Sequence, residues 1–138
     1  MSSTWIEPTP EQVAPLAESA DPSPIVMVNL LRFKEEATAP DEDVSGAEAY
    51  VRYAAATAPF LAGVGGRVLV AVECRESVIG PEDAEWDMVA LVEYPSREAF
   101  LAMVSDPDYL AIHPHRVAAL DDSRLILSEP VAPPAAAE

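Results

Sequence analysis

Runs of apolar residues and stretches of helical periodicity follow one another along the chain. Residues 25–33 form a nearly continuous apolar run with β-branched side chains, which is typical of a strand buried on both faces. Residues 67–79 alternate imperfectly between apolar and polar positions, and residues 86–94 form another apolar run after a Gly-Pro turn. We therefore predict strands over 25–33, 67–79 and 86–94, the last two as an antiparallel hairpin, and a short final strand over 124–128.

Helix-capping residues precede the stretches with helical periodicity. Thr9 is followed by proline and begins a short N-terminal helix, and Ser45 begins a longer helix that ends at a glycine-rich segment. Ser96 caps a third helix, which Asp106 and the proline after it restart. This last helical stretch runs toward residue 120, and we expect Pro114 to kink or break it.

From residue 25 the expected order is strand, helix, strand, strand, helix, strand. This α+β order is the βαββαβ pattern of a ferredoxin-like sandwich, here with an extra N-terminal helix. We divide the chain into an N-terminal helical extension (1–24), the ferredoxin-like domain (25–129) and a proline- and alanine-rich tail (130–138) that we expect to be disordered.

The predicted strands are apolar on both of their faces, although the helices can cover only one face of the sheet. The other face therefore needs a second covering layer. A second copy of the same sheet supplies one, so we predict an isologous homodimer in which two sheets close on each other as a dimeric α/β barrel.

The charge and cysteine content limit the partners and the location. The 138 residues make about one domain, and 24 acidic against 8 basic residues give a formal net charge of −16. This acidic balance excludes nucleic acid and anionic membranes as partners. A lone cysteine, no signal-peptide pattern and no long apolar run predict a cytoplasmic protein that does not enter a membrane.

His113 and His115 are the first candidates for chemistry, because histidine titrates near neutral pH. On a continuous helix they point in different directions, so they cannot share one metal ion unless Pro114 breaks the helix. We expect no metal site, and His113 is either a buried structural side chain or a base in a pocket. The chain also has no dinucleotide fingerprint and no nucleophile elbow, so no cofactor is expected.

Further candidates are polar or aromatic side chains within apolar segments. Asn29 and Arg32 interrupt the first strand three positions apart, so they emerge on opposite faces. Asn29 either holds an oxyanion of a substrate or bonds within the sheet, and Arg32 either binds an anion or pairs with a carboxylate. Tyr50 and Tyr53 place hydroxyls on the inner side of a helix, where they pack in the core or contact a ligand. Trp86 either orients a ligand or anchors the edge of its strand.

Four separated segments resemble, in this order, a family of uncharacterised bacterial proteins. The segments are IVMVNLLRF (25–33), YPSREAF (94–100), DPDY (106–109) and ALDDSRL (119–125). That family, a domain of unknown function, belongs to the dimeric α/β-barrel superfamily and is related to monooxygenases of antibiotic biosynthesis. The resemblance implies a ferredoxin-like homodimer, and the superfamily also includes lactone isomerases and haem enzymes.

Three functions are compatible with these observations. The first is a small-molecule-binding barrel, with cofactor-independent proton transfer or oxygenation of a carbonyl or aromatic metabolite. In this hypothesis His113 and Asn29 are catalytic, and Arg32, Tyr50, Tyr53, Trp86 and His115 contact a small, partly apolar molecule. The alternatives are a non-catalytic ligand-binding or interaction module and, third, a haem-binding enzyme. A connected cavity lined by several of these polar side chains would favour the first hypothesis over a purely structural role.

Overall fold

The computed structural model describes residues 4–82 and 85–131, and its elements confirm the expected order. From β1 onward the chain forms the βαββαβ arrangement of a ferredoxin-like α+β fold, with the last helical region divided in two. The elements are α1 (Pro10–Glu18), β1 (Ile25–Phe33), α2 (Gly46–Gly63), β2 (Arg67–Glu73), β3 (Met88–Tyr94), α3 (Arg97–Val104), α4 (Pro107–Ala119) and β4 (Leu120–Ser128).

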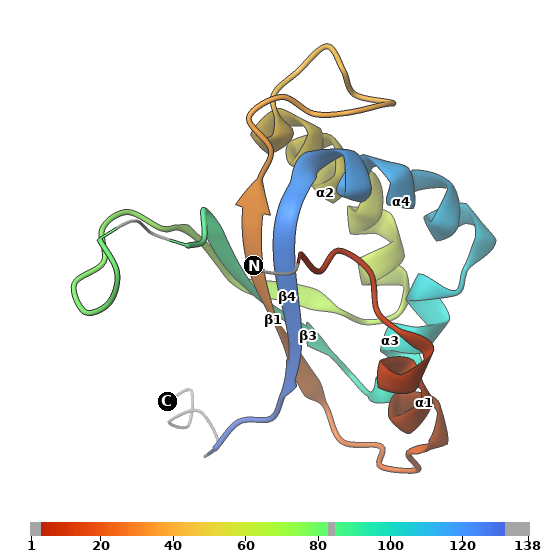
Figure 1. Ribbon diagram of the computed structural model, residues 1–138. Coiled ribbons are helices and arrows are strands. Elements are labelled where there is room, and N and C mark those ends of the chain that lie inside the picture. Colours follow the sequence, from red (N-terminus) through yellow and green to blue (C-terminus); the bar gives the residue numbers. More distant parts are fainter. Residues whose placement is uncertain (1–3, 83–84, 132–138) are drawn as a thin grey trace.

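The strands form one antiparallel sheet in the order β2-β3-β1-β4, and all helices lie on one side of it (Figure 1). β1 lies between β3 and β4, which explains its mainly apolar sequence. Residues opposite each other in the ladder share a face, and Met27 pairs with Val92 and Leu127 on the face toward the helices. This face holds the cavity described below.

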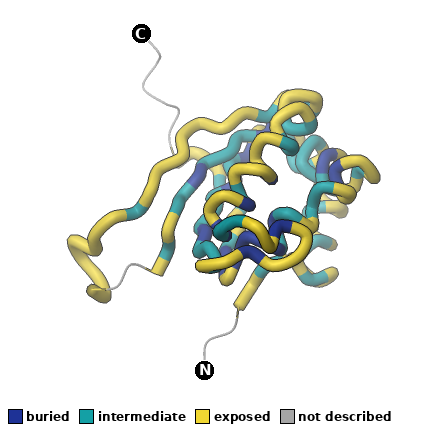
Figure 2. The backbone as a smooth tube through the Cα atoms, turned by 90° about the horizontal axis from the view of Figure 1, so that it is seen from above, coloured by how far each residue is buried: buried dark blue, intermediate teal, exposed yellow. Residues whose placement is uncertain are grey.

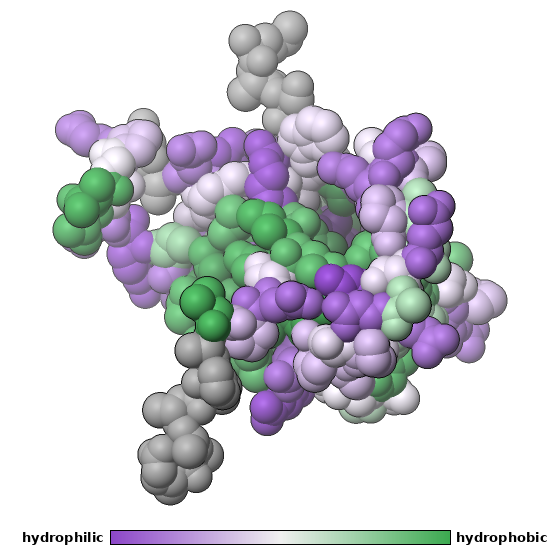
Figure 3. Space-filling view, turned by 90° about the horizontal axis from the view of Figure 1, so that it is seen from below, coloured by the Kyte–Doolittle hydropathy of each residue, from purple (hydrophilic) through white to green (hydrophobic). Residues whose placement is uncertain are grey.

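The other face of the sheet, called the open face here, carries no helix. It bears alternate side chains of all four strands, namely Val26, Val28, Leu30, Val70, Val72, Val89, Leu91 and Ile126. Val70, Val72 and Ile126 are 44%, 48% and 50% exposed in the single chain. Figure 3, which looks at the end of the molecule that faces down in Figure 1, shows apolar side chains gathered in an area bordered by hydrophilic residues.

The hydrophobic core consists of two clusters on the helix side of the sheet. The first contains Ile25 and Met27 of β1 packed against Tyr53 of α2 and Met103 of α3. The second surrounds Leu31, where β1 meets the start of α2 and the junction of α4 with β4. Together the clusters fix the helices against the sheet while leaving the space between them partly unfilled.

β2 is shorter than the sequence predicts, because it ends at Glu73 rather than residue 79. The last bond between the hairpin strands joins the backbone N of Cys74 to the carbonyl O of Asp87, at 2.9 Å. Arg75 and Glu76 beyond it are polar and have no neighbouring strand to cover. The described parts of the connection, residues 74–82 and 85–87, therefore leave the sheet as a largely exposed arm (Figures 1 and 2), and β3 begins at Met88 rather than 86.

Pro114 does not break α4, which continues to Ala119. Proline removes only one helical hydrogen bond, and the turns on both sides are held by the buried residues Tyr109, Arg116 and Ala118. β4 then begins at Leu120 rather than residue 124. Within the described residues no helix is long and apolar enough to span a membrane. Of the tail that was expected to be disordered, residues 132–138 lie outside the described part of the chain.

Candidate functional site

A cavity of about 1410 Å³ lies between the sheet and the helices. Its walls are mainly apolar. Among the polar side chains that line it are Asn29 of β1, Tyr50, Tyr53 and Thr57 of α2, and His113 and Arg116 of α4. A mainly apolar space between a sheet and helices, with a few polar side chains in its wall, is a common form of small-molecule site.

The segment before α1 closes one side of this cavity by crossing α4 and β4. The backbone N of Trp5 donates to Oδ1 of Asp122 at 2.8 Å, and Ser123 Oγ donates to the carbonyl O of Trp5. Arg116 donates from Nη1 to the carbonyl O of Ile6. Because these bonds use buried side chains, the sequence of β4 and α4 fixes where the N-terminal segment lies.

Tyrosine hydroxyls form the polar part of the α2 wall. The hydroxyls of Tyr53 and Tyr109 lie 2.6 Å apart, and Phe60 packs edge-on against Tyr109. Burial, together with the neighbouring Tyr53, raises the pKa of Tyr50 to about 12, although the charge of Arg116 acts in the opposite direction. Burial also raises the pKa of Tyr109. These phenols are therefore neutral at physiological pH and can donate hydrogen bonds.

His113 lines the cavity from α4 and is held by the N-terminal segment. Its Nε2 lies 3.0 Å from Oε1 of Glu7, and its ring is 6.2 Å from that of Tyr109. Its Nδ1 is buried and has no hydrogen-bond partner among the described residues. If Nε2–H donates its hydrogen bond to Glu7, the lone pair of the neutral ring is on Nδ1, which is the arrangement of a general base.

Two further residues that line the cavity have buried polar atoms without a hydrogen bond in the described protein. These atoms are Oγ1 of Thr57 and Nη1 of Arg97, the latter 3.7 Å from Oδ2 of Asp21. Leaving a buried donor or acceptor unpaired costs about 1–3 kcal/mol. Such atoms are rare in structural cores, and together with His113 Nδ1 they all belong to residues of one cavity.

Asn29 lines the cavity but directs its amide toward the sheet. Nδ2 donates to the carbonyl O of Met27 at 3.3 Å and to that of Ala90 at 3.5 Å. These are the bonds within the sheet that the structural alternative for Asn29 expects. Both distances are long for such bonds, so they hold the amide only weakly.

Arg32 and Trp86 lie on the open face and do not line the cavity. The side chains of Arg32 and Asn29 lie on opposite faces of the sheet, as their spacing of three residues predicts. Nε of Arg32 donates a hydrogen bond to the carbonyl O of Glu85 at 2.8 Å. The guanidinium carbons of Arg32 and Arg124 are 5.4 and 5.2 Å from the Trp86 ring centre. This arrangement of one ring between two cations anchors the end of the β2–β3 arm to the sheet.

His115 also lies outside the cavity, in an ion-pair cluster near the start of α2. Its Nδ1 is 2.7 Å from Oδ2 of Asp41, and Nη1 of Arg52 is 2.8 Å from Oδ1 of the same carboxylate. Burial acts to raise the pKa of Asp41, but the bonds from His115 and Arg52 outweigh it and lower the pKa. The cluster fixes the loop between β1 and α2, which is a structural task.

The structure thus brings together four of the seven predicted side chains, Asn29, Tyr50, Tyr53 and His113, and separates Arg32, Trp86 and His115 from them. Sequence reasoning missed Arg116 and Tyr109. Both lie on the same side of α4 as His113. The sequence did contain a signal for Arg116, because this charged residue occupies a position where the helical pattern demands an apolar one. Within residues 4–82 and 85–131 no group of side chains has the composition of a metal site.

The chain is similar to proteins of a family whose function is unknown. The family described as Domain of unknown function (DUF1330) matches residues 40–130. A protein of unknown function from Rhodopseudomonas palustris is 40% identical with a TM-score of 0.87, over 95% of this chain and 100% of that one. No curated protein matches.

More distant structures share the fold alone. SnoaB, a cofactor-independent oxygenase from Streptomyces nogalater, is 18% identical with a TM-score of 0.51, over 81% of this chain and 99% of that one. A dimeric protein of unknown function with a ferredoxin-like fold, from Bacteroides fragilis, is 8% identical with a TM-score of 0.50, over 77% and 95%. Identities this low establish common architecture and nothing about a shared reaction.

Proposed function

We propose that this chain, which belongs to the DUF1330 family of unknown function, binds a small, partly apolar molecule in the cavity between its sheet and its helices. The observation that carries the proposal is the concentration of unpaired polar atoms in that cavity. Oγ1 of Thr57 and Nδ1 of His113 have no partner among the described residues, and Nη1 of Arg97 has only its long ion pair with Asp21; all three residues line the cavity. A purely structural core satisfies such groups internally, whereas a binding site leaves them for its ligand.

We propose cofactor-independent proton transfer on a carbonyl compound as the chemistry. His113 is the acid–base residue, because Glu7 orients the ring and leaves Nδ1 to exchange a proton with the ligand. The neutral hydroxyl of Tyr50 is a hydrogen-bond donor for a developing oxyanion, and Asn29 can join it by turning away from its weak bonds to the sheet. SnoaB, which shares this fold, is itself a cofactor-independent enzyme.

We also propose that the functional unit is a homodimer closed through the open face. In the single chain this face exposes valine and isoleucine side chains from both edge strands of the sheet. Apolar area of this kind is removed from water when two identical sheets face each other about a two-fold axis. The cavity lies on the opposite side of the sheet, so both protomers keep their own site. The protein from Bacteroides fragilis, which is described as dimeric, shares this fold.

The binding proposal is tested by filling the cavity. Ala54 lines it from the middle of α2, and a phenyl ring at this position occupies space that the ligand needs. We expect Ala54→Phe to weaken binding of N-phenyl-1-naphthylamine, a neutral probe that fluoresces in apolar sites, by about tenfold or more. Fluorescence titration of the wild type and the variant measures this change.

Ala55→Phe is the matched control, because Ala55 is the next residue on the same helix, is exposed and does not line the cavity. We expect it to bind the probe as the wild type does. Equal binding by wild type and Ala54→Phe, with both proteins folded by circular dichroism, would place the probe elsewhere and refute the cavity as the site.

A further inference from the structure

Three charged side chains are buried in the described part of the chain, and two of them have a partner of opposite charge. Asp41 is 1% exposed and pairs with Arg52 and His115. Asp122 is 5% exposed and pairs with Arg124 at 2.7 Å. Both carboxylates follow the rule that a buried charge is neutralised by a neighbour.

Arg116 is the exception. It is 9% exposed, and its guanidinium donates to a neutral backbone oxygen, that of Ile6. Within residues 4–82 and 85–131 it forms no ion pair with a carboxylate, although acidic residues outnumber basic ones three to one, 24 against 8. A buried cation without a counter-charge is unfavourable unless something else supplies the charge.

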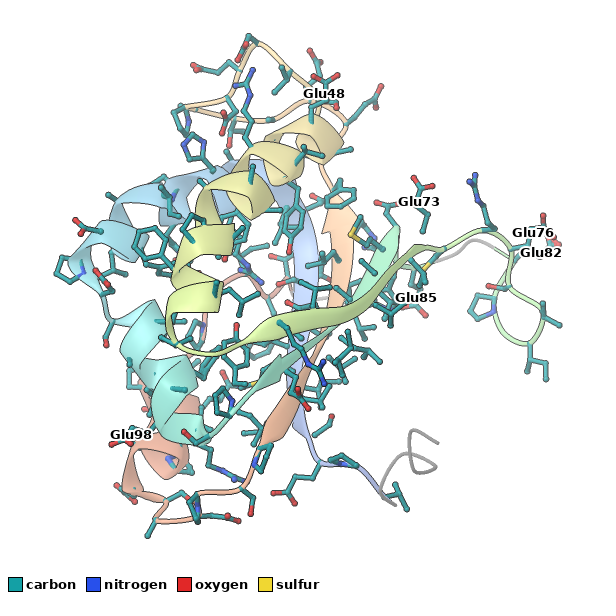
Figure 4. All side chains as sticks on the ribbon, turned by 180° about the vertical axis from the view of Figure 1, so that it is seen from behind. Glu48, Glu73, Glu76, Glu82, Glu85 and Glu98 are labelled. Atoms are coloured by element: carbon teal, nitrogen blue, oxygen red, sulfur yellow. The ribbon has the colours of Figure 1, made fainter. Side chains whose placement is uncertain are left out.

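The acidic residues of the protein lie mainly on its outside. Figure 4 labels glutamates at the periphery, at the start of α2, on α3, at the end of β2 and along the β2–β3 arm, namely Glu48, Glu98, Glu73, Glu76, Glu82 and Glu85. The carboxylate that lines the cavity beside α4 is Glu7, which bonds to His113 rather than to Arg116. Among the residues that the structure describes, the buried guanidinium thus has no internal anion.

The surroundings of Arg116 indicate what kind of anion fits. Arg116 lines the same cavity as Tyr50 and Tyr109, and its charge acts on the pKa of both hydroxyls in the direction opposite to burial. Most of the cavity wall is apolar or aromatic, with side chains such as Met27, Val92 and Phe100. A planar guanidinium beside neutral hydroxyls matches a carboxylate, which carries one negative charge and accepts two parallel bonds.

We propose that Arg116 binds the carboxylate of the ligand, so that the molecules this cavity takes are monoanionic carboxylic acids with an apolar or aromatic body. This inference rests on the proposed function, since it names the class of ligand for the same site. The two other arginines that line the cavity do not serve this purpose, because Arg97 pairs with Asp21 and Glu129, and Arg124 with Asp122. Arg116 thereby sets the orientation, with the apolar body of the ligand extending along the sheet.

The test compares acids with their amides, which have nearly the same shape but no charge. The probes are benzoate, 4-phenylbutyrate and 2-naphthoate, each with its primary amide, and isothermal titration calorimetry of the wild-type protein measures the affinities. We expect the best-bound acid to bind about tenfold tighter than its amide, as a charge-assisted pair with a buried arginine provides. Arg116→Gln should abolish the preference, while Arg116→Lys should keep part of it.

Arg75→Gln is the matched control, because it removes one positive charge from the exposed arm, away from the cavity. It should leave the acid preference unchanged. Equal binding of acid and amide by the wild type would overturn the assignment of Arg116 but leave the cavity as a binding site. Failure of every probe, charged and neutral, would overturn the proposed function and this inference with it. The comparison on the wild type needs no variant, so a folding defect of Arg116→Gln does not prevent the decision.

Discussion

Gly46→Ala is expected to lower the free energy of unfolding by about 3 kcal/mol or more, because the added methyl group has no space. A Cβ at this position would lie 2.6 Å from the backbone N of Lys34 and 2.7 Å from the carbonyl O of Ala119, and still closer to the carbonyl O of Lys34. These backbone atoms belong to the residue that follows β1 and to the junction between α4 and β4, so they cannot rotate away as a side chain could. Chemical denaturation monitored by circular dichroism measures the loss.

Gly63→Ala tests whether the effect is one of space. Gly63 is also in α2, at its last position, and a Cβ there meets no atom within 4 Å. Alanine favours a helix over glycine by up to about 1 kcal/mol, so this variant should be neutral or slightly more stable. Similar free energies of unfolding for the two variants would contradict the close approach of the start of α2 to the backbone after β1 and at the α4–β4 junction.

Leu91→Arg is expected to separate the proposed dimer into monomers, with a dissociation constant at least about 100-fold higher than that of the wild type. Leu91 lies in the middle of the open face, opposite Val28 of β1 and Val70 of β2. A guanidinium there would be buried between two sheets without a partner, and the two-fold axis would bring two of them into one interface. Sedimentation equilibrium measures the effect.

Val51→Arg provides the comparison for this experiment. Val51 is apolar and 65% exposed, but it lies on α2, away from the open face. The variant should sediment as the wild type does, which we expect to be a dimer. A monomeric wild type, or a dimer that Leu91→Arg leaves intact, would mean that the open face is not the dimer interface.

The fold was predictable from the sequence because its signals are local. The capping residues Thr9, Ser45 and Ser96 mark the starts of α1, α2 and α3, where each side chain accepts a bond from the backbone three residues on. The position of β1 follows from its mainly apolar run of nine residues. The end of β2 was predicted wrongly, because a strand ends where its neighbour leaves the ladder, and residue pattern alone does not contain that information.

The candidate site was predictable only in part, for a related reason. The helical stripe placed Tyr50 and Tyr53 toward the sheet, and the strand parity separated Asn29 from Arg32; both expectations agree with the structure. The position of the N-terminal segment was not predictable, because it depends on bonds to residues more than a hundred positions away, as between Ile6 and Arg116. That segment decides which partner His113 has and leaves Arg116 facing the cavity without a carboxylate.

The protein's own methionines can show whether the cavity between sheet and helices is the binding site. Met27 and Met103 line the cavity and are 3% and 4% exposed, whereas Met88 packs in the second core cluster and does not line it. In a ¹³C-methyl-methionine NMR titration with 2-naphthoate, we expect the Met27 and Met103 signals to shift while that of Met88 stays in place. Unchanged Met27 and Met103 signals at saturating probe, or a shift confined to Met88, would contradict binding in the cavity.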